Sequence, residues 1–145
     1  MELRYCGPSG GTDGETFSDD VRLQDCQLME VQIYAQQQIN GLRIIHQTCA
    51  GDHHPFPLHG SATGDCYHLT LAPDEFIISI SGYYDSQING LRIQTNKQIS
   101  PLLGSEEGAG IYRYEAPPGA EIVGFWGQAG DGIDALGVIL RRRGL

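Results

Sequence analysis

Gln-Ile-Asn-Gly-Leu-Arg-Ile occurs at residues 38–44 and, without a single change, again at residues 87–93, an offset of 49. A degenerate third copy, Ile-Asp-Ala-Leu-Gly-Val, begins at Ile133, which is 45 residues after Ile88. Self-similarity at a fixed spacing is typical of folds built from repeated units. The sequence therefore predicts three structural units, each about 45 residues long.

Short segments rich in β-branched and aromatic residues fill the chain around these copies, and turn-forming residues separate them. In one of them, strict alternation would place Phe76, Ile78 and Ile80 on a dry face and Ile77 on the opposite face with two serines. No helical apolar stripe of useful length is present. We therefore expect an all-β chain of about ten to twelve strands. The predicted strands are residues 28–34, 39–45, 67–71, 76–84, 88–93, 110–114, 122–126 and 133–140.

A unit of this length holds about four short strands and cannot bury its apolar face alone, so the three units must share one core. A three-bladed propeller is excluded because propellers have four or more blades. The sequence instead predicts three sheets that face inward around one axis, as the sides of a prism do. At 145 residues, we expect one domain spanning residues 1–145.

The charge balance argues against several classes of partner. Acidic residues outnumber basic ones by 18 to 9, a net charge of −9, so we expect no nucleic-acid partner. The only basic run, residues 141–143, is interpreted as a short solvated tail, with a nucleic-acid or anionic-lipid patch as the alternative. Without a long apolar stretch or a signal peptide, we expect no membrane insertion and a cytoplasmic location, with unconventional release as a further route.

Cysteines and histidines give no metal or redox motif. Cys6, Cys26, Cys49 and Cys66 lack C-x-x-C spacing and are expected to be buried free thiols, with a Cys49–Cys66 bridge as the alternative. The five histidines, residues 46–68, match no zinc spacing, so we expect no metal and no cofactor. No nucleophile elbow is present, and a weak hydrolase would rest on the loose histidines alone. We therefore expect no enzymatic activity.

The loops before the shared isoleucines differ among the three copies. Only the third, residues 130–134, begins with glycine and ends in a carboxylate, Asp134. Glycine permits a turn that directs backbone N–H groups into a small concavity, and a carboxylate only accepts hydrogen bonds. Such an arrangement suits a neutral ligand with adjacent hydroxyls, as in a sugar. Alternatively, Gly130 and Gly132 form only a bulge and Asp134 caps its own turn.

A second glycine-dense stretch at residues 7–17, Gly-Pro-Ser-Gly-Gly-Thr-Asp-Gly-Glu-Thr-Phe, favours the ligand interpretation, because backbone could approach a ligand closely there. This opening, the Ile-Ser-Gly-Tyr-Tyr segment at residues 80–84 and the Ile-Val-Gly-Phe-Trp-Gly segment at residues 122–127 resemble the jacalin-related lectin family over nearly the whole chain. His59-Gly60 and residues 95–97 and 135–138 extend the resemblance.

The resemblance implies a β-prism I fold of three four-stranded antiparallel Greek-key sheets with pseudo-threefold symmetry. It also implies reversible carbohydrate binding without metal. Carried over by position, Asp134 would accept hydrogen bonds from two sugar hydroxyls, while the backbone N–H groups of Asp131, Gly132 and Gly14 would donate. Gly130 and Ile133 complete this Gly-x-x-x-Asp loop.

The other two loops end in Asn40 and Asn89, which leaves them as weaker, secondary carbohydrate contacts. An uncleaved opening loop and the lack of an aromatic residue in the third loop favour mannose or glucose over galactose. Tyr83 and Tyr84 are expected either to stack on the sugar or to be ordinary strand-end aromatics, and Asp13 would bring a negative charge near the pocket.

These features predict a mannose- or glucose-type lectin that binds glycans or glycoproteins. A galactose-type lectin and a protein-interaction module with a vestigial sugar pocket are the alternatives. Agglutination needs more than one site per particle. We therefore expect a homodimer or homotetramer.

Overall fold

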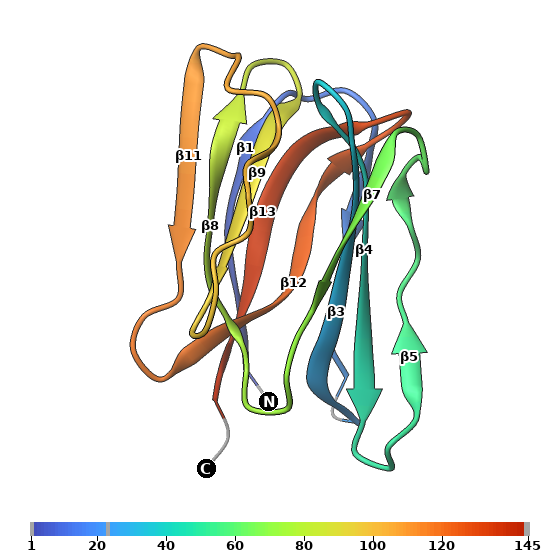
Figure 1. Ribbon diagram of the computed structural model, residues 1–145, viewed down its shortest axis with the longest axis vertical. Coiled ribbons are helices and arrows are strands. Elements are labelled where there is room, and N and C mark those ends of the chain that lie inside the picture. Colours follow the sequence, from blue (N-terminus) through green and yellow to red (C-terminus); the bar gives the residue numbers. More distant parts are fainter. Residues whose placement is uncertain (1, 23, 144–145) are drawn as a thin grey trace.

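The computed structural model describes residues 2–22 and 24–143, and within these ranges the chain forms thirteen strands and no helix. All strand pairs are antiparallel, which confirms the predicted all-β class (Figure 1). The strands are β1 (Leu3–Gly10), β2 (Glu15–Ser18), β3 (Asp25–Ala35), β4 (Ile39–Thr48), β5 (His53–Pro55), β6 (His59–Gly60), β7 (Asp65–Thr70), β8 (Ile77–Tyr84), β9 (Ile88–Thr95), β10 (Leu103–Gly104), β11 (Gly110–Glu115), β12 (Ala120–Ala129) and β13 (Ile133–Arg142).

Hydrogen bonding joins these strands into one sheet of eight and one of five. The five-stranded sheet contains β3 to β7 and is called here the first-repeat group. The larger sheet consists of a second-repeat group, β8 to β11, and a third-repeat group, β1, β2, β12 and β13. A single register pair, Ile122 with Ile77, connects these two groups. Antiparallel sheets are confirmed, whereas three separate four-stranded sheets remain a prediction.

The repeated sequence supplies the shared core. Its Ile, Leu and Ile/Val positions lie in one hydrophobic cluster with residues of all three groups, and each is at most 1% exposed. Burying one such side chain stabilises the fold by roughly 1.5–3 kcal/mol. The recurrence of these residues is therefore explained by packing. The nine side chains are those of Ile39, Leu42, Ile44, Ile88, Leu91, Ile93, Ile133, Leu136 and Val138.

A β-bulge occurs at the same place in each group. The register shifts at Met29, Ile78 and Val123, which are 49 and 45 residues apart, the same offsets as the repeat. An extra residue changes the alternation of the strand. The expected alternation from Phe76 to Ser81 is consequently wrong, since Ile77 and Ile80 are both fully buried and Ile78 is only half-buried.

The opening stretch is more ordered than its glycine content indicated. Residues 7–10 belong to β1, which pairs with β13, and Glu15–Ser18 form β2, which pairs with β12. Only residues 11–14 form a loop. Local patterns missed both strands because their partners lie more than a hundred residues further along the chain.

Two of the four cysteines are paired. Cys26 and Cys49 form a disulfide with a Cα–Cα distance of 5.2 Å, so both expectations, four free thiols or a Cys49–Cys66 bridge, are wrong. The register pair of Asp25 with Thr48 brings Cys26 and Cys49 together at the open end of the β3–β4 hairpin. Cys6 and Cys66 are free and half-buried.

The basic run is not a simple tail either. Arg141 and Arg142 belong to β13, and the Arg141 guanidinium donates hydrogen bonds to the Asp25 and Cys26 carbonyls, at 2.8 and 3.2 Å. Within residues 2–22 and 24–143, no helix is long and apolar enough to cross a membrane.

Candidate functional site

The turns between the paired strands of the three groups share one backbone conformation. A backbone N–H donates to a carbonyl two residues on in each: Gln36 to Gln38 at 3.1 Å, Asp85 to Gln87 at 3.0 Å and Gly130 to Gly132 at 3.0 Å. Neither Gly130 nor Gly132 has a positive φ. Glycine is therefore not required for the turn itself, because Gln36 and Asp85 adopt the same turn.

A second bulge follows each turn. It makes Asn40, Asn89 and Asp134 the unpaired residues between two register pairs. A β-bulge changes the direction in which the side chain of its extra residue points. The carbonyls of these three residues accept backbone N–H groups at 2.8 Å from Ser61, Ser105 and Gly11 respectively. Each turn is thus placed beside a second loop, residues 61–64, 105–108 or 11–14.

In the first two groups, the asparagine amide closes the gap between turn and loop. Asn40 Nδ2 donates to the Thr63 carbonyl at 2.9 Å, and Asn89 Nδ2 donates to the Glu107 carbonyl at 3.0 Å. Asp134 has no N–H to donate. In the third group the Gln128 amide lies beside the loop instead, and in the orientation that turns its nitrogen toward the loop, this nitrogen lies 3.1–3.2 Å from the carbonyl oxygens of residues 12–14. The Asp134 carboxylate is left without a described donor.

Two glycines create the space beside this carboxylate. A Cβ on Gly130 would lie 3.7 Å from Asp134 Oδ2 and 3.8 Å from Gly14 Cα, so the missing side chain leaves room between them. Gly14 has a φ of +83°, and a Cβ there would lie 2.5 Å from Asp134 Oδ2. In the first group, by contrast, the Gln36 side chain reaches over the corresponding loop, 2.6 Å from a Cβ built on Gly64.

Unpaired backbone donors occur in the turn and in the neighbouring loop. Within the described residues, the N–H groups of Gly14, Asp131 and Gly132 donate to no protein acceptor. Asp131 is exposed, as is the loop residue Asp13. The pKa of Asp134 is raised by burial first, and then by the negative charges of Asp13 and Asp131. The site therefore offers fixed donors and one strong acceptor, and suits a ligand with several hydroxyls.

The remaining predicted residues have other surroundings. Ile133 is a core residue, 1% exposed. Tyr84 packs against Tyr112, with ring centroids 6.3 Å apart, and its ring lies close to the Gly110 backbone. Tyr83 lies near Gly90. Both tyrosine contacts are within the second-repeat group, in agreement with strand-end packing.

Gln38 was missed from the sequence. Its Nε2 donates to Asn40 Oδ1 at 3.2 Å, its Oε1 accepts from Gln87 Nε2, and a Cβ on Gly132 would lie 3.7 Å from its amide nitrogen. The first-repeat turn therefore borders the candidate site. The available signal was the replacement of the repeated glutamine by Gly132 in the third copy.

Four of the five histidines make structural contacts. No cluster of three or more potential metal ligands occurs in the part of the chain that the structure describes. His59 Nε2 lies 2.6 Å from buried Asp19 Oδ1 and joins the first- and third-repeat groups, while His46 Nε2 lies 2.8 Å from the Val123 carbonyl oxygen. His54 and His68 pair with carboxylates in the first-repeat group.

Comparisons with known proteins agree with these observations. Residues 6–139 match the family described as Jacalin-like lectin domain. The chain is similar to "Jacalin-related lectin 12" of Arabidopsis thaliana, with 30% identity over 141 residues that cover 90% of this chain. The alignment covers 30% of that protein's own length, and 25% of "Jacalin-related lectin 16" of the same plant, so the chain spans under a third of these relatives.

Solved structures of similar fold include artocarpin in complex with mannotriose, with a TM-score of 0.86, 26% identity, and coverage of 97% of this chain and 99% of that one. The mannose-binding lectin from Champedak has a TM-score of 0.85 and 26% identity, with coverage of 97% and 98%.

Proposed function

Because the chain belongs to the jacalin-like lectin family, we propose that it binds carbohydrate reversibly through the third-repeat turn and the loop of residues 11–14. The observation that carries this proposal is the difference among three otherwise equivalent turns. Asparagine closes the first two, whereas the third has the Asp134 carboxylate beside the room left by Gly130. Within the described residues, the backbone N–H groups of Gly14, Asp131 and Gly132 donate to no protein acceptor. We infer further that the three strand groups correspond to the three sheets of a β-prism.

The roles of the residues follow from their chemistry. Asp134 accepts hydrogen bonds from two hydroxyls of one sugar, and the N–H groups of Gly14, Asp131 and Gly132 donate to oxygens on the other side of the ring. Gly130 leaves room for the ring. Hydroxyls both donate and accept, so the arrangement recognises a polyol without metal.

Mannose and glucose are the proposed sugars. The turn of residues 130–134 carries no aromatic side chain on which the face of a galactose ring could stack. Two similar structures are of mannose-binding proteins, named for mannotriose and for mannose respectively. Association into a dimer or tetramer would supply the avidity that one site per chain lacks.

Titration calorimetry with methyl α-mannoside and methyl α-galactoside tests this function. We expect binding of the mannoside alone, with one site per chain. Binding of the galactoside alone would favour a galactose-type lectin. If neither sugar binds at millimolar concentration, the proposal is overturned, and a protein-interaction module with a vestigial pocket is favoured.

When the pH is lowered, sugar affinity should begin to fall at a higher pH than it would if Asp134 had the ordinary pKa of an aspartate. Only the ionised Asp134 offers its full set of acceptors, and its pKa is raised by burial and by Asp13 and Asp131. Since the pKa of the folded state lies above the unfolded value, protonating this group favours the folded state. The loss of binding at this group therefore does not reflect unfolding.

In Asp13→Asn, the pH below which sugar affinity falls (the acid limit) should be lower than in the wild type. The reason is that the substitution removes one of the two negative charges that raise the Asp134 pKa. Mannoside affinity measured from about pH 7 down to about pH 3, with circular dichroism at each step, checks both expectations. An unchanged limit in the variant would contradict the assigned role of Asp13.

A further inference from the structure

A cavity of about 850 Å³ lies at the end of the molecule opposite the proposed sugar site. Strand β13 connects the two, running from near Asp134 at one end to Arg142 at the other. Eight residues of extended strand span about 26 Å at ~3.3 Å per residue. In Figure 1 the turns of the three groups lie at the upper end, and the start of β1 and the end of β13 lie at the lower end. The two sites can therefore be occupied independently.

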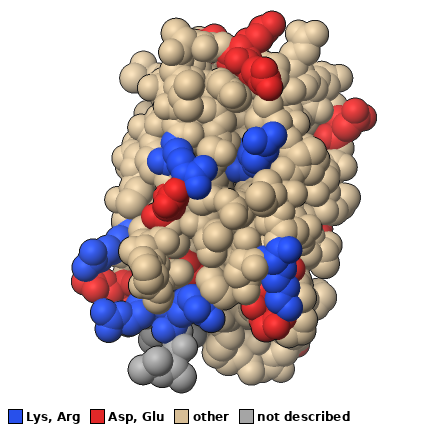
Figure 2. Space-filling model, turned by 60° about the vertical axis from the view of Figure 1, so that its left-hand side comes forward, with Lys and Arg blue, Asp and Glu red and all other residues tan. Residues whose placement is uncertain are grey.

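Positive charge is concentrated at this cavity. Four of the nine Lys and Arg residues line it, although the chain carries a net charge of −9. In Figure 2 the visible Lys and Arg side chains lie in the middle and lower parts of one face, and the upper end carries only acidic ones. The four are Arg4, Arg141, Arg142 and Arg143.

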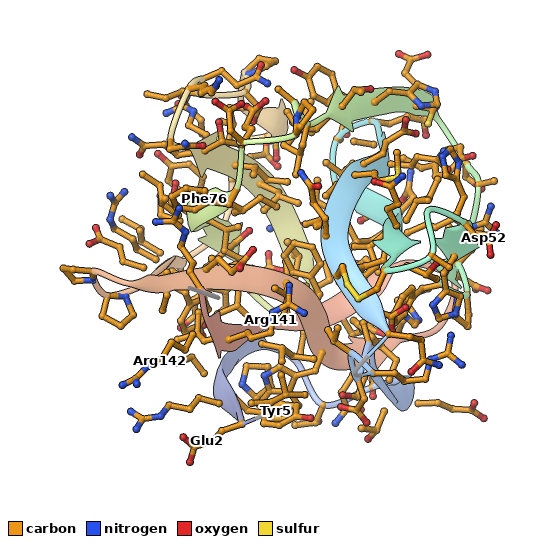
Figure 3. The ribbon with its side chains drawn as sticks, turned by 90° about the horizontal axis from the view of Figure 1, so that it is seen from below. Glu2, Tyr5, Asp52, Phe76, Arg141 and Arg142 are labelled. Carbon is orange, nitrogen blue, oxygen red and sulfur yellow. A yellow bond between two sulfur atoms is a disulfide. The ribbon has the colours of Figure 1, made fainter. Side chains whose placement is uncertain are left out.

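Two of the three carboxylates in the lining are already engaged. Asp25 is fully buried and accepts hydrogen bonds from the Arg22 backbone and from His54. Glu121 lies 3.8 Å from Arg141. The third, Glu2, is exposed and forms no ion pair with the described arginines. In Figure 3, Glu2 and Arg142 lie at the same outer edge of the molecule, and Arg141 lies further in.

The arginines divide into fixed and available groups. Hydrogen bonds to the Asp25 and Cys26 carbonyls hold Arg141 in place. The Arg143 backbone donates to the Gly119 carbonyl at 2.8 Å, and its guanidinium lies 3.7 Å from the centre of the Phe76 ring. Within residues 2–22 and 24–143, Arg4 and Arg142 form no ion pair or side-chain hydrogen bond. Their guanidinium groups remain available to an oxyanion.

We propose that this cavity is a second ligand site, for a small molecule that carries phosphate groups. Guanidinium groups pair bidentately with phosphate oxygens, and a doubly charged phosphate can engage more than one of them. The lining also contains Pro117, Ala120 and Leu140, which form an apolar surface for the body of such a ligand. The volume of the cavity, about 850 Å³, lies within the range of small-molecule sites. Distant carboxylates oppose binding weakly, since the Debye length at physiological salt is about 8 Å.

The source of the phosphate is either a free metabolite or the headgroup of a phosphorylated lipid. With sugar at one end and phosphate at the other, one chain would connect a glycan to a phosphorylated molecule or surface. This inference does not depend on the proposed sugar site. It would stand even if that site bound nothing.

Inositol hexakisphosphate, titrated at about 0.15 M salt, is the first probe. We expect one site per chain in the wild type and an affinity at least about tenfold lower in Arg4→Gln/Arg142→Gln. The matched control is Arg92→Gln/Arg113→Gln, which removes two exposed arginines outside the cavity and should change affinity less than about twofold. Melting temperatures of both variants verify folding.

Vesicles of phosphatidylcholine containing phosphatidylinositol bisphosphate distinguish the two sources. Binding of the soluble compound alone supports a free ligand, and binding of the vesicles as well supports a headgroup. No binding of either probe would overturn the proposal. So would an equal loss in the control variant, which would indicate diffuse charge, or displacement of the phosphate by methyl α-mannoside in a chain that binds the mannoside.

Discussion

Replacing Asp134 by asparagine is expected to lower mannoside affinity by about a hundredfold or more. The variant replaces one accepting oxygen by an N–H donor and removes the charge from the other, and a hydrogen bond to a charged group is worth roughly 1.5–3 kcal/mol. Asparagine also gains an N–H, and in the first two groups that N–H donates to the carbonyl of the neighbouring loop. At position 134 it would reach toward the Asp13 carbonyl in the same way. The substitution therefore closes the site as well as removing its charge.

Calorimetry of Asp134→Asn against the wild type measures this loss. Asp131→Asn is the matched control, because it makes the same chemical change on an exposed side chain of the same turn and keeps the backbone N–H of residue 131. We expect the control to retain affinity within a few-fold. If Asp134→Asn binds the mannoside as tightly as the wild type, the third-repeat turn is not the site.

The features that can be predicted from the sequence are mainly those that packing decides. The Ile, Leu and Ile/Val positions of the repeat were recognisable because a shared core demands the same residues in each unit, and all are buried as expected. The bulges at Met29, Ile78 and Val123 were not recognisable, since a bulge depends on the partner strand. The alternation from Phe76 to Ser81 was misjudged for this reason.

The candidate site was found through a difference between copies. Asp134 stands where the other copies have asparagine, and that single change was visible in the chain. Gln38 and Gln128 could not be assigned to the site, because their positions depend on contacts between loops far apart in sequence. The reason for Gly130 was also misjudged. Gly130 has no positive φ, and what the structure shows is room beside Asp134 Oδ2 where its side chain is missing.

The three repeats share one backbone arrangement, and one turn diverges from the other two in sequence. This explains why the core could be predicted from residues that recur and the candidate site from residues that differ. The backbone hydrogen bonds of the three turns are equivalent, so the fold does not need glycine or aspartate at the third. The substitutions there remove the side chains at positions 130 and 132 and replace the asparagine amide by the Asp134 carboxylate, while the core positions of the repeat stay buried. Local departures from a repeat that have no packing reason are expected at functional sites.

Gly130→Gln should therefore abolish mannoside binding while leaving the fold intact. The φ of Gly130 is one that any residue adopts, and Gln36 already stands in the equivalent turn, so the backbone accepts the change. A Cβ would lie 3.7 Å from Asp134 Oδ2, an ordinary contact, and the rest of the side chain would occupy the space proposed for the sugar ring. We expect affinity to fall at least about tenfold.

The measurements are mannoside calorimetry and the melting temperature. Asp85→Gln is the matched control, because Asp85 holds the same place in the second-repeat turn. Both variants should melt close to the wild type, and only Gly130→Gln should lose the sugar. Retained binding in Gly130→Gln would show that the ligand does not occupy the space between Asp134 and Gly14. A large drop in the melting temperature would instead contradict the equivalence of the three turns, on which the argument rests.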